Sequence, residues 1–220
     1  MRYLKLVVAI AGLLAGSAVA SPANPAIGAE YVTLASPQAP QADGKKIEVI
    51  EFFMYHCPAC NAIEPELAAW VKKHGDTVHF RRIHLPHGTI DPEAHLFLTL
   101  EAMGKEDALH ASVMQAWHVD HHRLKDDADN LDWALKNGLD KAKFQDAYNS
   151  FGVTTKLRNL TRLANNYAVN STPTLVIDGR YQTNPSMVET SNRGLPRDDL
   201  ARASMQVVDA LVAKAASEKK

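Results

Sequence analysis

The sequence predicts an α/β fold in which a mixed central sheet is flanked by helices and carries an inserted all-helical domain. A strand–helix–strand pattern occupies residues 47–83, and helical periodicity then runs from 91 to about 169. Strand patterning returns at 174–181, and a last helix follows at 197–214. This order predicts a sheet built from both ends of the chain, with a helical block between them.

The first 20 residues have the pattern of a secretory signal peptide. Two basic residues precede an uncharged apolar stretch at 6–15, and Ala18 and Ala20 form a small-x-small cleavage pattern. We therefore expect residues 1–20 to be removed after Ala20 and the mature protein to be exported. A membrane anchor is the alternative, but the apolar stretch is short for spanning a bilayer. Export would place the chain where disulfides persist.

The charge balance argues against nucleic acid as a partner. The predicted mature chain has 22 basic and 25 acidic residues and no basic cluster. The ten histidines are scattered, and we expect most of them at the surface. The size suits one elaborated domain or a domain with an insertion.

The first part of the predicted mature chain leads into a central strand. Residues 21–46 are rich in Pro, Ala and Gln and are expected to be extended, with an edge strand at 31–34. Residues 47–55 form a nearly continuous apolar run with β-branched and aromatic side chains. Such a run is typical of a strand that is buried on both faces.

A helix follows this strand directly. Cys57 is expected as its N-cap and Pro58 as its first residue, where the missing N–H of proline costs nothing. Pro65 should kink the helix, and Gly75 should end it. A second strand at 78–83 completes a strand–helix–strand unit, with Cys57 at the carboxyl end of the first strand, where open α/β sheets place their sites.

The later elements have equally clear signals. The sequence 91–93, Asp-Pro-Glu, begins a helix with an N-cap and a proline at the first position. The strand at 174–177 is followed by Asp178-Gly179, a dipeptide typical of a type I′ hairpin turn.

Cys57 and Cys60 are the only cysteines, so they cannot belong to a disulfide framework. As a structural crosslink the pair is weak, because closing a four-residue loop stabilises by only about 2 kcal/mol. As a zinc half-site it lacks a second C-x-x-C, and His84 with His87 is an unusually spaced substitute. The C-x-x-C spacing favours a redox-active pair.

Three segments together resemble one known family. Their residues are Glu51-Phe52-Phe53 leading into Cys57-Pro58-Ala59-Cys60, then Thr172-Pro173-Thr174-Leu175, and finally Asp178-Gly179-Arg180-Tyr181-Gln182-Thr183-Asn184-Pro185. In these segments and in element order the chain resembles the DsbA-type thiol:disulfide interchange proteins. The resemblance implies a thioredoxin fold over 21–90 and 162–220, with an inserted helical domain over 91–161. Family members often carry histidine where this chain has Ala59.

The chemistry of thiol–disulfide exchange gives the two cysteines different roles. Cys57, at a helix N-terminus, is the candidate for the attacked sulfur, because backbone N–H groups and the helix dipole favour its thiolate. Cys60, one turn into the helix, is the candidate resolving thiol. Pro58 and Ala59, the two residues between the cysteines, are candidate supporting residues of the site.

Five further residues are candidates for the site. Glu51 is expected either as a buried acid that tunes proton transfers of the cysteines or as a strand-end charge that reaches water. The resemblance places a basic partner at Arg82. It also implies a cis peptide bond before Pro173, with the backbone of Thr172 available to a substrate chain. His56 is expected at the rim of the site.

We therefore expect an oxidase that donates the Cys57–Cys60 disulfide to unfolded exported proteins and binds no cofactor or metal. The resemblance implies that the mature protein works in the periplasm and that a DsbB-type membrane partner reoxidises it. An isomerase or reductase of the same fold is one alternative, although the lead-in of about 26 residues has no room for the dimerisation module of such isomerases, so we expect a monomer. A zinc- or peptide-binding module is the other alternative.

Overall fold

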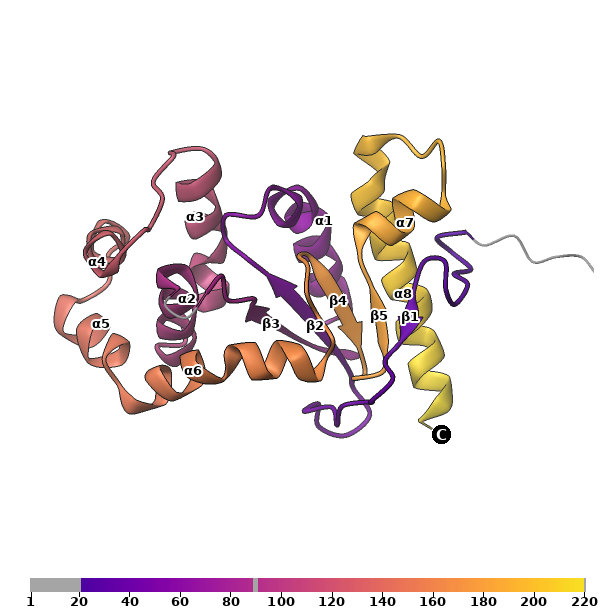
Figure 1. Cartoon of the computed structure of the whole chain (residues 1–220), viewed down its shortest axis with the longest axis horizontal. Coiled ribbons are helices and arrows are strands. Elements are labelled where there is room, and N and C mark those ends of the chain that lie inside the picture. Colours follow the sequence, from indigo (N-terminus) through magenta and orange to yellow (C-terminus); the bar gives the residue numbers. More distant parts are fainter. Residues whose placement is uncertain (1–20, 89–90, 220) are drawn as a thin grey trace, which may run out of the picture.

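A five-stranded mixed sheet forms the centre of the protein (Figure 1). The computed structural model describes residues 21–88 and 91–219, so the predicted signal peptide lies outside the described residues. The strand order is β1-β5-β4-β2-β3, with β2 parallel to β3 and all other pairs antiparallel. The strands are β1 (Val32–Thr33), β2 (Ile47–Phe53), β3 (Val78–His84), β4 (Thr174–Ile177) and β5 (Tyr181–Thr183).

The helices follow the predicted order, with one addition. They are α1 (Pro58–His74), α2 (Pro92–Ala102), α3 (Glu106–His118), α4 (Asp127–Lys136), α5 (Lys141–Tyr148), α6 (Phe151–Asn166), α7 (Pro185–Ser191) and α8 (Leu200–Glu218). Helix α7 was not predicted, although its signals, an Asn184 cap and Pro185 at the first position, are of the usual kind. The last helix begins as a 3₁₀ turn at Arg197–Asp199 and extends beyond the predicted end at 214.

Strand β2 is the element that positions the cysteines. All seven of its residues are buried, as expected for a strand with a neighbour on each side. Ile47 and Val49 pack with α1 and α8 on one face of the sheet, and Ile50 and Phe52 pack on the other face, where Phe52 meets Tyr167 at the end of α6. The strand is two residues shorter than predicted, because residues 54 and 55 already belong to the loop that leads to α1.

The helical block lies to one side of the sheet. Figure 1 shows α2 to α5 grouped together and α6 running from this block back towards β4. The domain division at 91–161 stays a prediction, and α6 passes residue 161 without a break. No helix in the described part of the chain is long and apolar enough to cross a membrane.

The hairpin between β4 and β5 has the predicted type I′ geometry. Asp178 and Gly179 both have positive φ, 52° and 61°. A Cβ atom on Gly179 would overlap the carbonyl of Gln38, so only glycine fits here. This contact fixes the lead-in segment against the hairpin.

Candidate active site

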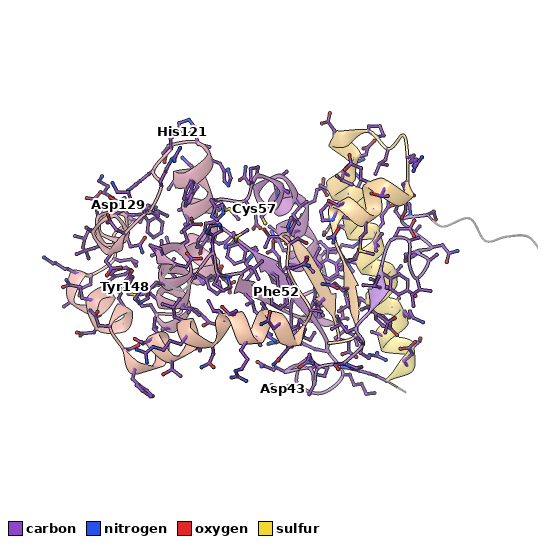
Figure 2. The ribbon with its side chains drawn as sticks, viewed as in Figure 1. Asp43, Phe52, Cys57, His121, Asp129 and Tyr148 are labelled. Carbon is purple, nitrogen blue, oxygen red and sulfur yellow. The ribbon has the colours of Figure 1, made fainter. Side chains whose placement is uncertain are left out.

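Cys57 occupies the start of α1, as predicted. It has extended backbone angles, its Sγ accepts the Cys60 backbone N–H at 3.3 Å, and Pro58 is the first helical residue. Figure 2 places Cys57 between α1 and the helical block, at the opposite end of β2 from the loop that carries Asp43. The cysteine therefore lies at the carboxyl end of the central strand, where α1 begins.

The surroundings of Cys57 stabilise its thiolate. A hydrogen bond from the Cys60 side chain lowers the pKa of Cys57 to about 5, against the opposing effect of burial. The Thr172 side chain and the backbone N–H groups of Cys60 and Ala59 lower the pKa further. These donors favour the anion because they are aimed at the sulfur before any charge develops.

Cys60 has the opposite character. It is fully buried, and burial raises its pKa far above the usual thiol range. Its hydrogen bond to Cys57 and the negative charge of Glu51 raise the pKa further. Both cysteines are free in this structure. The pair is therefore strongly unequal, with one thiolate at neutral pH and one thiol.

The loop before β4 faces Cys57. The Thr172–Pro173 peptide bond is cis, as the resemblance implies. The carbonyl oxygen of Thr172 lies 3.5 Å from the Cys57 Sγ, which donates to it as a thiol. Thr174, the first residue of β4, holds this loop by donating from its hydroxyl to the Ser171 carbonyl at 2.8 Å.

Glu51 is a fully buried acid and does not reach water. Arg82 is its register partner on β3, and the Arg82 Nε donates to the Glu51 Oε2 at 3.0 Å. Burial raises the pKa of Glu51 to about 7, although the charge of Arg82 lowers it. The other oxygen, Oε1, is buried and makes no hydrogen bond among the described residues. A carboxyl group that titrates near neutral pH therefore lies close enough to Cys60 to influence its ionisation.

Arg82 also joins Glu51 to a larger group that sequence reasoning missed. Its Nη2 donates to Glu64 of α1 at 2.9 Å, and its Nη1 lies 3.7 Å from Glu106 of α3. His110 lies between these two acids, with its Nδ1 2.7 Å from Glu106 and its Nε2 3.5 Å from Glu64. One signal in the sequence could have pointed to this group. His110 lies four residues after Glu106, on the same helix face, and it is spaced from the buried Val113 and Met114 as a residue of the apolar face would be.

His56 lies at the rim of the site, with its side chain 32% exposed. Its ring is 5.7 Å from that of Trp117 and 6.0 Å from that of His87, measured between centroids. Glu93 of α2 holds both its backbone N–H and its ring. Glu93 was not among the predicted site residues, because nothing in the local pattern links position 93 to position 56.

Histidines also hold the backbone of Tyr55, two residues before Cys57. The Tyr55 N–H donates to the His84 Nε2 at 3.4 Å, and the Tyr55 carbonyl lies 2.8 Å from the His118 Nε2. The expectation that most histidines lie at the surface holds only in part: three of the ten (His79, His87 and His121) are exposed, five are half-buried, and His84 and His110 are buried. Buried and half-buried histidines here satisfy backbone groups of a loop that no strand pairs.

The described residues include no group of three or more His, Cys, Asp or Glu side chains placed to hold a metal ion. The substitute ligand pair His84 and His87 does not converge on the cysteines. The His84 Nε2 is used by the Tyr55 N–H, and the His87 ring faces His56. The geometry gives no support to the zinc alternative.

A thioredoxin-type sheet that presents two such unequal thiols at a helix N-terminus defines the class of thiol:disulfide oxidoreductases. Comparison with known proteins agrees. The family described as thioredoxin matches residues 41–195. The thiol:disulfide interchange protein DsbA of Burkholderia cepacia is 39% identical over 176 residues, which cover 80% of this chain and 83% of that protein.

Relatives from Pseudomonas aeruginosa are similar in sequence and in structure. Its thiol:disulfide interchange protein DsbA (strain PAO1) is 40% identical over 156 residues, covering 70% of this chain and 74% of that protein. A crystal structure of Pseudomonas aeruginosa DsbA superposes with a TM-score of 0.75 at 36% identity, covering 88% of this chain and 96% of that one. The chain belongs to the DsbA family of thiol:disulfide oxidoreductases.

Proposed function

We propose that this protein is a periplasmic dithiol oxidase, which donates the Cys57–Cys60 disulfide to newly translocated proteins through a mixed disulfide. The observation that carries the proposal is the inequality of the two thiols, with the pKa of Cys57 lowered to about 5 and that of Cys60 raised. A stable Cys57 thiolate is a good leaving group and favours the reduced enzyme, which makes the disulfide an oxidant. The predicted signal peptide supports export.

The reaction transfers two electrons from a substrate dithiol to the enzyme disulfide. A substrate thiolate attacks the Cys57 sulfur, the Cys57–Cys60 bond breaks, and Cys60 leaves with the electron pair. The second substrate thiolate then attacks the substrate sulfur of the mixed disulfide. The substrate disulfide forms, and Cys57 leaves as a stabilised thiolate. One proton from the substrate dithiol ends on Cys60 and the other enters solvent.

Cys60 has to gain a proton when it leaves, because its raised pKa makes the thiol its stable form. Glu51 is the group that would exchange this proton. Its pKa of about 7 lets it occupy both protonation states near neutral pH, and its Oε1 makes no competing hydrogen bond among the described residues. The Arg82 guanidinium donates to Glu51 and would stabilise its carboxylate form, so that Glu51 can give up its proton to Cys60.

The loop of Thr172 and Pro173 would bind the substrate chain next to the reacting sulfur. The Thr172 carbonyl lies 3.5 Å from the Cys57 Sγ, and a thiolate no longer donates to it. The carbonyl would then be available to a backbone N–H of an extended substrate. After one turnover the reduced protein has to return two electrons to an acceptor, for which we propose a DsbB-type membrane partner.

The test combines a redox equilibrium with two activity assays on the purified mature protein. We expect the Cys57–Cys60 pair to equilibrate with glutathione as an oxidising couple, and the oxidised protein to introduce disulfides into a reduced, unfolded substrate. A pair as reducing as a structural disulfide would contradict the proposal. Reshuffling of a scrambled substrate at the same rate as oxidation would favour the isomerase, and stoichiometric zinc would favour the metal-binding module.

A further inference from the structure

The residue directly before Cys57 is held by a carboxylate from a distant part of the chain. Glu93 accepts the backbone N–H of His56 at 3.0 Å, and the His56 Nδ1 lies 2.9 and 3.0 Å from its two oxygens. Because Nδ1 donates to the carboxylate, it carries a proton, and a second proton on Nε2 makes the ring a cation. One side chain thus fixes both the backbone and the ring of His56.

Both members of this pair favour their ionised forms. The pKa of His56 is raised, chiefly by the hydrogen bond to Glu93 and against burial. Burial opposes ionisation of Glu93, but the hydrogen bond from His56 and the neighbouring His84 ring outweigh it and lower the pKa of Glu93 to about 2. The negative charge of Cys57 itself also raises the pKa of His56, so the two groups interact.

We propose that His56 provides the positive charge that stabilises the Cys57 thiolate, and that Glu93 is the positioning residue that holds this charge in place. The motif offers no other cation, because Pro58 and Ala59 between the cysteines are uncharged. His56 thereby sets how strongly oxidising the Cys57–Cys60 pair is. This inference rests on Cys57 being the attacked sulfur of the proposed function.

The other titratable groups around His56 do not take over this role. His84 and His118 are bound to the Tyr55 backbone, and the Asp91 carboxylate caps α2 and accepts the His87 N–H. The His87 ring lies 6.0 Å from the His56 ring and forms no ion pair in the described part of the chain. Only His56 is both adjacent to Cys57 and held by a carboxylate.

The first experiment measures the Cys57 thiolate by ultraviolet absorbance against pH, together with the glutathione equilibrium. His56→Gln removes the cation and leaves the Glu93 charge uncompensated. We expect the pKa of Cys57 to rise by roughly half a unit to one unit, and the pair to become about three- to tenfold less oxidising in its equilibrium constant. His56→Lys keeps a positive charge and should restore most of both values. His87→Gln is the matched control and should change neither.

The second experiment separates an electrostatic role from a purely structural one. If His56⁺ stabilises the thiolate, the thiolate must stabilise His56⁺ equally, because the coupling is reciprocal. NMR titration should therefore give a lower His56 pKa in the oxidised protein, which has no Cys57 thiolate. Glu93→Gln should lower the His56 pKa in both forms, whereas Glu101→Gln on the exposed side of the same helix should not.

Two results would overturn the inference: a Cys57 pKa and glutathione equilibrium unchanged in His56→Gln, or a His56 pKa that is equal in the two redox forms. Either can occur while the unaltered protein still oxidises substrates, and the proposed function then stands. Failure of the unaltered protein to oxidise substrates would instead refute the proposed function.

Discussion

The ionisation of Cys57 makes the relative stability of the reduced and oxidised protein depend on pH. The pKa of Cys57 falls from 9.0 for an unperturbed thiol to about 5 in the folded protein. Because the folded value is the lower one, this contribution to stability is complete above the unfolded pKa and is lost as the pH falls through 5. At pH 7, which is two units above the folded pKa, only two of the four units of pKa difference contribute. They stabilise the folded protein by about 2.7 kcal/mol before screening by solvent. Cys60 adds nothing here, since it stays protonated in both states.

The oxidised protein has a different advantage. Its disulfide closes a loop of four residues, and the loss of chain entropy in the unfolded state stabilises the folded form by about 1.9 kcal/mol at any pH. Without screening, the thiolate contribution to the reduced form reaches this value about 1.4 pH units above the pKa of Cys57, at about pH 6.4, and screening by solvent moves this crossing to higher pH. We expect the oxidised form to be more stable below this crossing and the reduced form above it. A Cys57 pKa one unit higher moves the crossing to about pH 7.4.

Denaturant titrations of both redox forms at several pH values between 5 and 8 would measure this difference. Glu51 also titrates in this range, and its raised pKa makes stability fall as the pH rises from 4.5 to 7. Because Glu51 is present in both forms, its effect cancels to first order in the comparison. In Cys57→Ser, kept in reductant, the slope due to the thiolate should disappear. An oxidised form that is more stable at every pH, or a difference that does not change with pH, would refute the reasoning.

Three further predictions concern single residues of the site. Cys60→Ser should trap mixed disulfides on Cys57, visible on non-reducing gels, while Cys57→Ser traps none; the reverse pattern would exchange the two roles. Glu51→Gln should slow exchange near neutral pH by about tenfold or more in stopped-flow measurements, because Cys60 loses its proton-exchange partner, and unchanged rates would remove Glu51 from the mechanism. Ala59→His should make the pair more oxidising by a few tens of millivolts, at about 30 mV for each unit by which the added positive charge lowers the pKa of Cys57, with Ala59→Gln as the uncharged control.

Much of the fold could be predicted because its signals are local. The apolar run of β2 predicts a buried strand, and Asp178-Gly179 predicts a type I′ turn, each from residues that are adjacent in the chain. The structure confirms both. Helix α7 shows the limit of this approach. Its seven residues are too few for a periodic pattern to distinguish them from a loop, although Pro185 is a recognisable first residue.

The sequence by itself determined the inequality of the cysteines in outline. Cys57 caps a helix because a proline follows it, and Cys60 lies one turn further in; both facts depend only on neighbours in the chain. Glu51 could be singled out as an acid in an apolar strand, but its burial and its bond to Arg82 depend on the pairing of β2 with β3.

Only the tertiary structure decided which charges surround the pair. Glu93 meets His56 across 37 positions of sequence, and Thr172 meets Cys57 across 115. Such contacts leave no periodic or spacing signal, because they form when separate elements pack and not when one element folds. They are also the contacts that set ionisation, since a charge acts through distance in space and through the burial that packing creates.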